Sequence, residues 1–412
     1  MNAQLEYRFD PADPELIRDP YPIYRHMQSQ PGLHWALGNY WVATRYEDVR
    51  HVLTHRAFGQ GEFVRNIQLF YPADFDVLSH SSFRWLSEVF VMQDPPRHTR
   101  LRKLVTHALT AKRISDMQPR IEAITRALLD RVAPRHHMEV LCEFAYQLPT
   151  LVMCDMLGVE ESERTPERMS ALSQAIADSF LVFETRALSA SELKLADDQM
   201  DFLYDYFGAV FERRRADPRG DLTSALAAPT EDGDSLSQRE LITVVVAMFG
   251  AGFETTAHMI GNGLLTLQRN PSEWLRLVAD PFLAPNVVEE VLRCESSLQA
   301  SYRTALGDEV VSGTKISAGQ RVLCVVGAAN RDPAFVPDPD RFDITRKDLK
   351  IMSFGGGIHQ CVGQQLARLE GRIAFAELAK RFPNLKADTQ TPSWRPGFLF
   401  RGLKKLDAHW TG

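Results

Sequence analysis

The 412-residue chain predicts a mainly α-helical protein with a small β region, an α+β fold. Between about residues 94 and 270, long apolar-periodic segments contain few interior glycines or prolines, which favours consecutive helices. One segment, residues 237–268, is apolar nearly all round in its middle, so we expect it to cross the protein interior. Strand-type patterns with glycines at the turns are confined to about residues 30–60, 300–325 and 385–410.

Each element has a local signal. "DPPRHTRLRKLVTHAL" opens with Asp94 as an expected N-cap and with prolines in the first helical turn. After the long helix at 237–268, a shorter helix follows Pro285 in "NVVEEVLRCESS", and "DEVVSGTKISAGQRVLCVV" alternates as strands do. A last long helix is expected from about Cys361 to Phe382, with "RPGFLFRGLKKL" as a strand-like tail. No repeat or Gly/Ser linker divides the chain, so residues 1–412 are expected to form one domain.

Composition excludes several functional classes. The net charge of -6 argues against nucleic acid as a partner, because phosphate binding needs a basic surface. The five cysteines are far apart and show no metal-finger or redox spacing, so we expect a reducing, cytoplasmic location. The N-terminal sequence lacks a signal-peptide pattern, and the longest apolar run, residues 241–253, is too short to span a bilayer. A soluble protein without a membrane partner is expected.

The stretch "SFGGGIHQCVG" places Cys361 among glycines just before a helix. Glycines allow a tight turn with positive φ. At a helix N-terminus, the dipole and the free N–H groups favour a thiolate over a thiol. Such a thiolate can act as a nucleophile, a redox sensor or a metal ligand, whereas an isolated cysteine is more often a small buried side chain.

Two other patterns carry charge into apolar helices. "AGFETT" puts Glu254 and Thr255 in the middle of the long helix, where a carboxylate is costly unless it is paired or functional. The threonine hydroxyl would otherwise bond back to a helix carbonyl. Glu290 and Arg293 lie i,i+3 on one helix face, a spacing that alone indicates an ordinary solvated ion pair.

Phe354, Gly357, Cys361 and Gly363 fit the spacing Phe-x-x-Gly-x-x-x-Cys-x-Gly, which resembles the haem-binding loop of cytochromes P-450. The similarity extends over nearly the whole chain, from "DPYPIYRHM" to "RGLKKL". It implies the cytochrome P-450 fold, with a long central helix over the haem and a cysteine-bearing loop before the last long helix. It also implies haem b (iron protoporphyrin IX) as cofactor and Cys361 as the metal ligand.

The resemblance assigns roles to the other patterns. It makes Glu254 the acid and Thr255 the alcohol on the O2 side of the haem, with Phe253 in place of the usual polar residue. It makes Glu290 and Arg293 the family's structural Glu-x-x-Arg pair, with Arg331 and Arg341 available to complete the network. The propionates of the haem are expected to bind basic residues from three regions: His98, Arg102, Arg303 and His359.

The implied activity is that of a soluble, bacterial-type haem-thiolate monooxygenase. It would use O2 and externally supplied electrons to hydroxylate or epoxidise an apolar, medium-to-large organic substrate in secondary metabolism or catabolism. Family position places the substrate pocket at Ala247, Gly250, Ala251, Gln299, Phe398 and Leu399, with the segment 63–86 as a further wall. Arg65 or Arg84 could steer a substrate carboxylate.

Electrons must come from another protein. The chain has neither an iron–sulfur cysteine cluster nor a dinucleotide-binding glycine fingerprint, so we expect a ferredoxin or flavodoxin with its NAD(P)H reductase. A basic docking patch and scattered solubilising charges are equally good readings of Lys103, Lys112, Arg113, Lys347 and Lys350. A peroxide-driven peroxygenase and a non-catalytic haem-dependent ligand-binding protein are alternatives that the Glu254–Thr255 pair disfavours. We expect a monomer.

Overall fold

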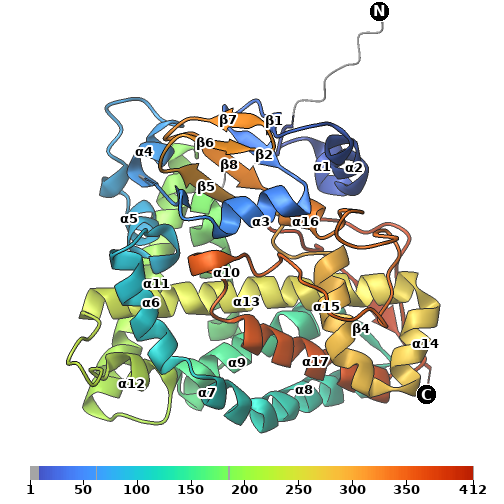
Figure 1. Ribbon diagram of the computed structural model, residues 1–412. Coiled ribbons are helices and arrows are strands. Elements are labelled where there is room, and N and C mark those ends of the chain that lie inside the picture. Colours follow the sequence, from blue (N-terminus) through green and yellow to red (C-terminus); the bar gives the residue numbers. More distant parts are fainter. Residues whose placement is uncertain (1–8, 62, 184–185, 412) are drawn as a thin grey trace, which may run out of the picture.

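The computed structural model describes residues 9–61, 63–183 and 186–411. Helices make up most of the molecule, and the largest β-sheet lies to one side of them, at the top of Figure 1. The long helix α13 (Gln238–Arg269) runs across the middle of the helical part. The mainly α-helical class with a small β region is therefore confirmed.

Helices occur along most of the described chain, from α1 to α17. The α-helices besides α13 are α1 (Pro14–Arg18), α2 (Tyr21–Ser29), α3 (Tyr46–Thr54), α4 (Phe63–Gln68), α5 (Ser81–Glu88), α6 (Arg97–Ala108), α7 (Ala111–Asp116), α8 (Gln118–Val132), α9 (Gln147–Leu157), α10 (Pro166–Ser179), α11 (Ala190–Ala216), α12 (Leu222–Ala227), α14 (Pro271–Ala279), α15 (Ala284–Cys294), α16 (Val326–Ala329) and α17 (Gln364–Arg381). Short helices that bear on the site are the 3-10 helices η2 (Phe90–Met92) and η8 (Gly357–His359) and the π-helix η4 (Leu141–Ala145).

The strands form three small sheets. They are β1 (His34–Trp35), β2 (Trp41–Ala43), β3 (Phe58–Gly59), β4 (His137–Glu139), β5 (Ser301–Ala305), β6 (Glu309–Val311), β7 (Thr314–Ile316), β8 (Arg321–Cys324), β9 (Lys386–Ala387) and β10 (Asp407–His409). The largest sheet has the order β1-β2-β8-β5-β3, in which β2 pairs parallel to β8 and the other pairs are antiparallel. This sheet joins the N-terminal part of the chain to the segment that follows α15.

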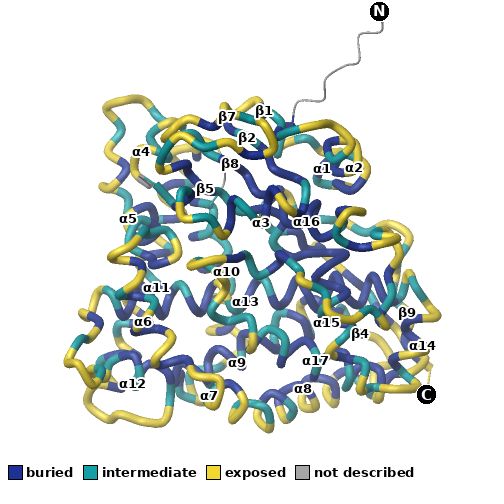
Figure 2. Tube along the Cα trace, viewed as in Figure 1, coloured by how far each residue is buried: buried dark blue, intermediate teal, exposed yellow. Residues whose placement is uncertain are grey.

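Helix α13 forms where the sequence predicts it, within one residue at each end. Ser237 caps it and exchanges hydrogen bonds with Glu240, a capping box that fixes its start. Its middle is buried among α9, α11, α15 and α17, as the dark-blue tube in Figure 2 shows. By length and composition α13 could cross a membrane, but 72% of its most apolar window is buried inside the protein. We therefore read it as a core helix.

Three local expectations were wrong. Asp94 does not cap α6, because its carboxylate accepts the backbone N–H groups of Gln60 and Gly61 instead. Strand β4 lies inside the stretch expected to be wholly helical, where three residues are too few to show a period. The tail at 395–406 forms only isolated bridges, and the C-terminal strand is β10.

Candidate active site

The loop that carries Cys361 is shaped by two glycines with left-handed backbone. Gly355 has φ +69° and Gly357 has φ +64°. A Cβ on Gly357 would lie 2.6 Å from the carbonyl oxygen of Leu53 at the end of α3, so a side chain at this position has no room. The Cys361 N–H donates to the carbonyl oxygen of Phe354 over 2.9 Å and closes the loop. The loop is therefore pressed against α3 while Cys361 remains exposed.

Cys361 precedes the last helix rather than starting it, since α17 begins at Gln364. The surrounding protein restricts hydration of the sulfur and raises the pKa of the thiol, which the Gly363 N–H and the guanidinium groups of Arg102 and Arg368 only partly offset. The N–H groups at the helix start lower the pKa of the thiol, as expected from the sequence, but the effect of burial is larger. A bound cation would supply the missing positive charge, because coordination deprotonates a thiol.

Two buried histidines lie beside this loop. His98 comes from α6 and His359 from η8, and their ring centroids are 4.4 Å apart. Among the described residues, none of their four ring nitrogens has a hydrogen-bond partner. Burial, followed by the charge of Arg303, lowers the pKa of His359 to about 3. Buried polar atoms are rarely left unpaired, so the pair indicates a site for a polar group of a ligand.

Two arginines complete this cluster. Arg303, on β5, is only 3% exposed and donates to the Ser301 hydroxyl and the Tyr302 carbonyl. No carboxylate within the described part of the chain forms an ion pair with it, and burial lowers its pKa. Arg102 is half-buried and donates to the Gln360 carbonyl over 2.7 Å. A desolvated cation is costly without an anion bonded to it. The nearest carboxylate among the described residues, Asp94, lies 4.0 Å from Nε2 of His359 and forms no ion pair with Arg303 or Arg102.

We call His98, Arg102, Arg303 and His359 the unpaired basic cluster. It adjoins the Cys361 loop, since His359 and Gln360 belong to both. Together they fit a haem: the propionates would accept hydrogen bonds from the cluster, and the accessible sulfur of Cys361 would ligate the iron. All four residues that the sequence assigned to propionate binding thus gather at one place.

Three residues of α13 spaced four apart, Ala247, Ala251 and Thr255, form an accessible stripe on a helix that is mostly buried. Ala247 and Thr255 are half-buried and Ala251 is exposed, while their helix neighbours Phe253 and Glu254 are buried. Small side chains at this spacing leave open space along one face. The Thr255 hydroxyl donates to the Ala251 carbonyl over 2.7 Å and forms no hydrogen bond with Glu254.

The side chain of Glu254 contacts Arg395 rather than Thr255. It is 6% exposed, and its Oε1 lies 3.1 Å from Nη1 of Arg395. Burial raises the pKa of Glu254, and the charge of Arg395 opposes that rise. The sequence indicated that a carboxylate in this helix needs a partner. It gave no sign of Arg395, because that residue lies far along the chain.

The Glu290–Arg293 pair is fully buried and fully bonded. Arg293 makes two contacts with the Glu290 carboxylate, at 2.7 and 2.8 Å, and also donates to the carbonyls of Pro339 and Arg341. The loop that follows α16 is thereby attached to α15. Arg346 approaches Glu290 from that same loop, with Nε 3.4 Å from Oε1.

The expected completion by the side chains of Arg331 and Arg341 does not occur. Arg341 offers only its carbonyl, and its guanidinium lies 3.5 Å from Asp343 at the surface. Arg331 donates to the Cys294 carbonyl and pairs with Asp340. Loop arginines that are close in sequence cannot be ranked without the backbone path, and this is why the sequence missed Arg346.

Of the six residues expected to line the substrate pocket, Ala247 and Ala251 border open space. Gly250 does not, because a Cβ there would lie 2.4 Å from the Phe180 ring. Its neighbour in α10, Ile176, closes the same side of the helix.

The three residues from other segments belong to a separate hydrophobic cluster. Gln299 is 1% exposed and accepts a hydrogen bond from the Tyr24 hydroxyl over 2.8 Å. Phe398 packs edge-on against Phe9 at 5.2 Å, and Leu399 packs against the same N-terminal cluster. These positions were assigned to the pocket by family order along the chain, which does not show which way a side chain turns.

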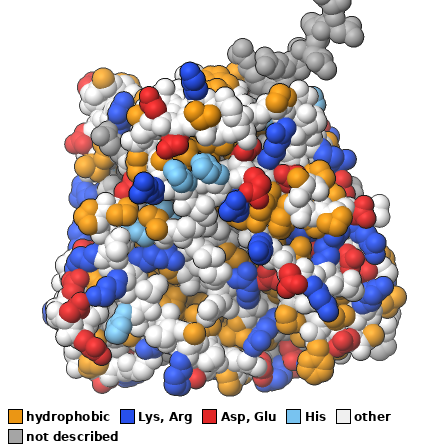
Figure 3. Space-filling view, viewed as in Figure 1, with side chains coloured by type: hydrophobic (Ala, Val, Ile, Leu, Met, Phe, Trp, Pro, Cys, Tyr) orange, Lys and Arg blue, Asp and Glu red, His pale blue; other side chains and the backbone are white. Residues whose placement is uncertain are grey.

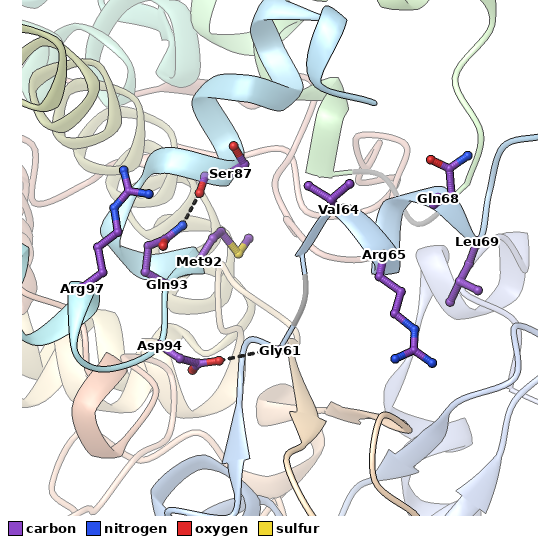
Figure 4. Close-up of a pocket in the computed structure, with 10 residues that line it drawn as sticks. All are labelled: Gly61, Val64, Arg65, Gln68, Leu69, Ser87, Met92, Gln93, Asp94 and Arg97. Atoms are coloured by element: carbon purple, nitrogen blue, oxygen red, sulfur yellow. Dashed lines mark hydrogen bonds between the residues drawn. The ribbon is translucent and has the colours of Figure 1, made fainter. Parts of the chain in front are cut away.

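An opening with a volume of about 910 Å³ lies between α4 and the segment from α5 to α6 (Figure 4). Its lining is Gly61, Val64, Arg65, Gln68, Leu69, Ser87, Met92, Gln93, Asp94 and Arg97. Val64 and Met92 lie toward its middle, between Arg65 on one side and Arg97 on the other. Arg84 takes no part, because it donates to the Leu78 carbonyl. Part of the segment 63–86 therefore does form a pocket wall, as expected.

Comparison with known proteins identifies the family to which this chain belongs. The family model for cytochrome P450 matches residues 32–279 and 281–401. The chain is 37% identical over 401 residues to Cytochrome P450 107B1 of Saccharopolyspora erythraea, covering 96% of each chain. It is 35% identical over 376 residues to the Mycinamicin IV hydroxylase/epoxidase of Micromonospora griseorubida, covering 90% of this chain and 89% of that protein.

Among solved structures, P450BioI in complex with an acyl carrier protein ligated to hexadec-9Z-enoic acid superposes with a TM-score of 0.86. The two share 30% sequence identity, over 96% of this chain and 100% of that one. The thiol-bearing loop, the unpaired basic cluster and the buried Glu290–Arg293 pair therefore have a common explanation. The chain belongs to the cytochrome P450 family and is a monooxygenase of its bacterial type.

Proposed function

We propose that the chain binds haem b, that Cys361 would ligate its iron, and that His98, Arg102, Arg303 and His359 would hold its propionates. The observation that carries this assignment is the unpaired basic cluster, because four buried or half-buried basic side chains converge beside the one loop that presents a thiol. We further propose that residues 1–412 act as a single domain around this site.

A haem with a thiolate ligand supplies O–O bond cleavage, since the sulfur donates electron density to the iron. The chain's own residues control the surroundings. Thr255 exposes its side chain in the accessible stripe of α13 and can hold a proton near the substrate. Glu254, one residue before it, is the acid that replaces that proton. The buried residues around the stripe keep other water away.

The substrate we propose is an apolar organic compound of medium to large size, converted by hydroxylation or epoxidation in secondary metabolism or catabolism. The small side chains of Ala247 and Ala251 leave space, and the 910 Å³ opening beside α4 combines apolar and polar lining. The relatives' reactions, a macrolide hydroxylation/epoxidation among them, support the same reaction class.

The remaining partners follow from the chemistry. A ferredoxin or flavodoxin with its NAD(P)H reductase would deliver electrons, in the cytoplasm and to a monomer. Of the suggested docking residues, Lys103 pairs with Asp232 and Lys112 with Asp116. Among the described residues, Lys347 and Lys350 form no ion pair, and the side chain of Arg113 donates only to the carbonyls of Ala108 and Gly220, so these three carry the unneutralised charge. On the face shown in Figure 3, Lys and Arg side chains alternate with carboxylates rather than gathering in one area.

Ligation is tested by the spectrum of the reduced protein under carbon monoxide. The unmodified protein should give the red-shifted band of a thiolate-ligated haem, and Cys361→Ser should lose it. A histidine-type spectrum, or no bound pigment, would disprove the assignment.

The role of Thr255 is tested by the ratio of product to NADPH consumed. Thr255→Ala should keep haem and substrate binding but divert reducing equivalents to hydrogen peroxide. Thr266→Ala is the matched control, because Thr266 makes the same kind of bond, to the Asn262 carbonyl, on the same helix. Equal ratios in Thr255→Ala and the parent would refute the role.

A further inference from the structure

Glu254 belongs to a closed ring of four polar side chains that no family motif includes. Nη1 of Arg395 forms an ion pair with Oε1 of Glu254 at 3.1 Å and donates a hydrogen bond to the hydroxyl of Tyr146 at 2.9 Å. The Tyr146 hydroxyl lies 3.1 Å from Nε2 of His258, and that nitrogen lies 3.9 Å from Oε1 of Glu254. The ring joins α13 to the start of α9 and to the C-terminal segment.

The hydrogens in this ring can be assigned. Arg395 only donates, so its two contacts require Glu254 and Tyr146 to accept. The Tyr146 hydrogen then points to Nε2 of His258, which must be unprotonated. Burial and the charge of Arg395 lower the pKa of His258 to about 3, which agrees with a neutral ring. The pattern is complete when Glu254 is ionised.

A second buried glutamate shows what Arg395 contributes. Glu370 in α17 is 1% exposed, its Oε2 has no hydrogen-bond partner among the described residues, and burial raises its pKa well above the ordinary value. Glu254 is almost as buried, yet the charge of Arg395 opposes the same effect. The positive charge of Arg395 is therefore what distinguishes the two sites: it opposes the rise in the pKa of Glu254, and burial alone sets the rise in the pKa of Glu370.

The ring also reaches the surface. The side chain of Arg395 is 33% exposed, whereas those of His258 and Glu254 are 1% and 7% exposed. Three charged groups act on Tyr146: Arg395 and Glu254, which belong to the ring, and Glu139 of β4, which lies outside it. Water therefore meets the ring at Arg395, between α9 and the C-terminal segment.

We propose that Arg395 is a positioning residue for proton delivery: its guanidinium, which is itself bonded to Tyr146, favours the ionised form of the Glu254 carboxylate, and it marks the side of the molecule from which protons enter. This inference rests on the proposed role of Glu254. Hydroxylation consumes O2, two electrons from the external donor and two protons, and it releases one water. For each proton, the Glu254 carboxylate takes up a proton from water at Arg395 and passes it toward the stripe of Thr255, so Glu254 is ionised again and no net charge accumulates.

The first test needs no turnover. Infrared spectra of the resting holoenzyme across pH, minus those of Glu254→Gln, report the protonated Glu254 carboxyl. Loss of the cation in Arg395→Gln should move its protonation midpoint up by about 1–3 pH units. Lys404→Gln is the matched control, because it removes an exposed charge from the same segment without touching the ring, and it should not move the midpoint. An unmoved midpoint in Arg395→Gln, or an equal shift in Lys404→Gln, would overturn the proposal.

The second test links the ring to proton delivery. The pH profile of the product-to-NADPH ratio should shift upward in Arg395→Gln by the same amount as the infrared midpoint, because both report Glu254. Thr255→Ala should lower the ratio without moving the infrared midpoint, which separates a failure of this inference from a failure of the proposed function. An infrared shift without a matching shift of the profile would overturn the proton route.

A conservative variant keeps the proposal testable if Arg395→Gln does not fold. Arg395→Lys retains the charge but loses the second contact with Tyr146, so its midpoint should rise by less than about one unit. A rise of the midpoint by more than about one unit in Arg395→Lys would then overturn the proposal, because the retained charge would not be what sets the midpoint.

Discussion

Two buried clusters of charge in this protein differ in one respect. Around Glu290 and Arg293, the charges are paired and the remaining donors meet backbone carbonyls. In the unpaired basic cluster, among the residues described, Arg303 forms no ion pair and the histidine nitrogens have no hydrogen-bond partner, with Asp94 4.0 Å from His359 as the nearest carboxylate. The first cluster is complete within the chain, and the second is complete only with an anionic ligand.

Whether a buried charge is bonded within the protein distinguishes charges that stabilise the fold from charges that bind a ligand, and this distinction needs no sequence motif. The burial of an ion costs on the order of several kcal/mol, unless a partner of opposite charge offsets that cost. A fully bonded pair offsets that cost in the protein alone and therefore stabilises a fold. An unbonded cluster leaves the cost in place until the ligand arrives, so it contributes to binding instead. Opposite responses to mutation should follow.

The largest effect is expected from breaking the complete cluster. Arg293→Met leaves the Glu290 carboxylate buried without its partner, which should lower the free energy of unfolding of the apoprotein by about 3–5 kcal/mol. Urea titration followed by circular dichroism measures it. The double replacement Glu290→Leu with Arg293→Leu should cost less than Arg293→Met, because no charge is left unpaired. A double variant that is less stable than the single one would contradict this account of the pair.

An intermediate effect of a different kind is expected from the incomplete cluster. Arg303→Met removes a buried cation that has no counter-ion, so the unfolding free energy of the apoprotein should stay the same or increase. Affinity for haem should fall by about 10–100-fold, the usual loss when a supporting contact to a bound cofactor is removed. Transfer of haem to an excess of apomyoglobin measures retention. A destabilised apoprotein with unchanged haem retention would reverse the comparison.

The sequence predicted the elements of both clusters but not their completeness. Helix α13, the Cys361 loop and the four basic residues of the unpaired cluster follow from periodicity and from motif spacing, which are local properties. Arg346 and Arg395 were missed because their partners are set by the path of long loops. A partner's identity depends on which of several nearby arginines the backbone brings within about 3 Å, a typical bonding distance, and no local pattern encodes that.

The substrate wall was the least predictable part for a related reason. Ala247 and Ala251, which family position assigned to the substrate wall, lie on one face of α13 and are not buried, and their contact with a substrate stays a prediction. Gln299 and Phe398 turn into the cluster of Tyr24 and Phe9 instead, since packing against the N-terminal segment decides their direction. Side-chain direction in an irregular segment is a tertiary property, so it appears only when the whole chain is folded.

The smallest effect is expected at the surface, where one lysine is paired with a carboxylate and another is not. Lys103 is paired with Asp232, whereas Lys350 forms no ion pair with any described residue. An exposed charge contributes about 0.2–1 kcal/mol to a contact, so Lys350→Gln should weaken the apparent affinity for a ferredoxin-type donor by about fivefold or less. Lys103→Gln should weaken it less, because its charge is already neutralised by Asp232. Stopped-flow reduction at low and high salt measures both, and the difference should vanish at high salt because screening removes it. A larger loss in Lys103→Gln than in Lys350→Gln would show that local pairing does not decide which surface charges reach the donor.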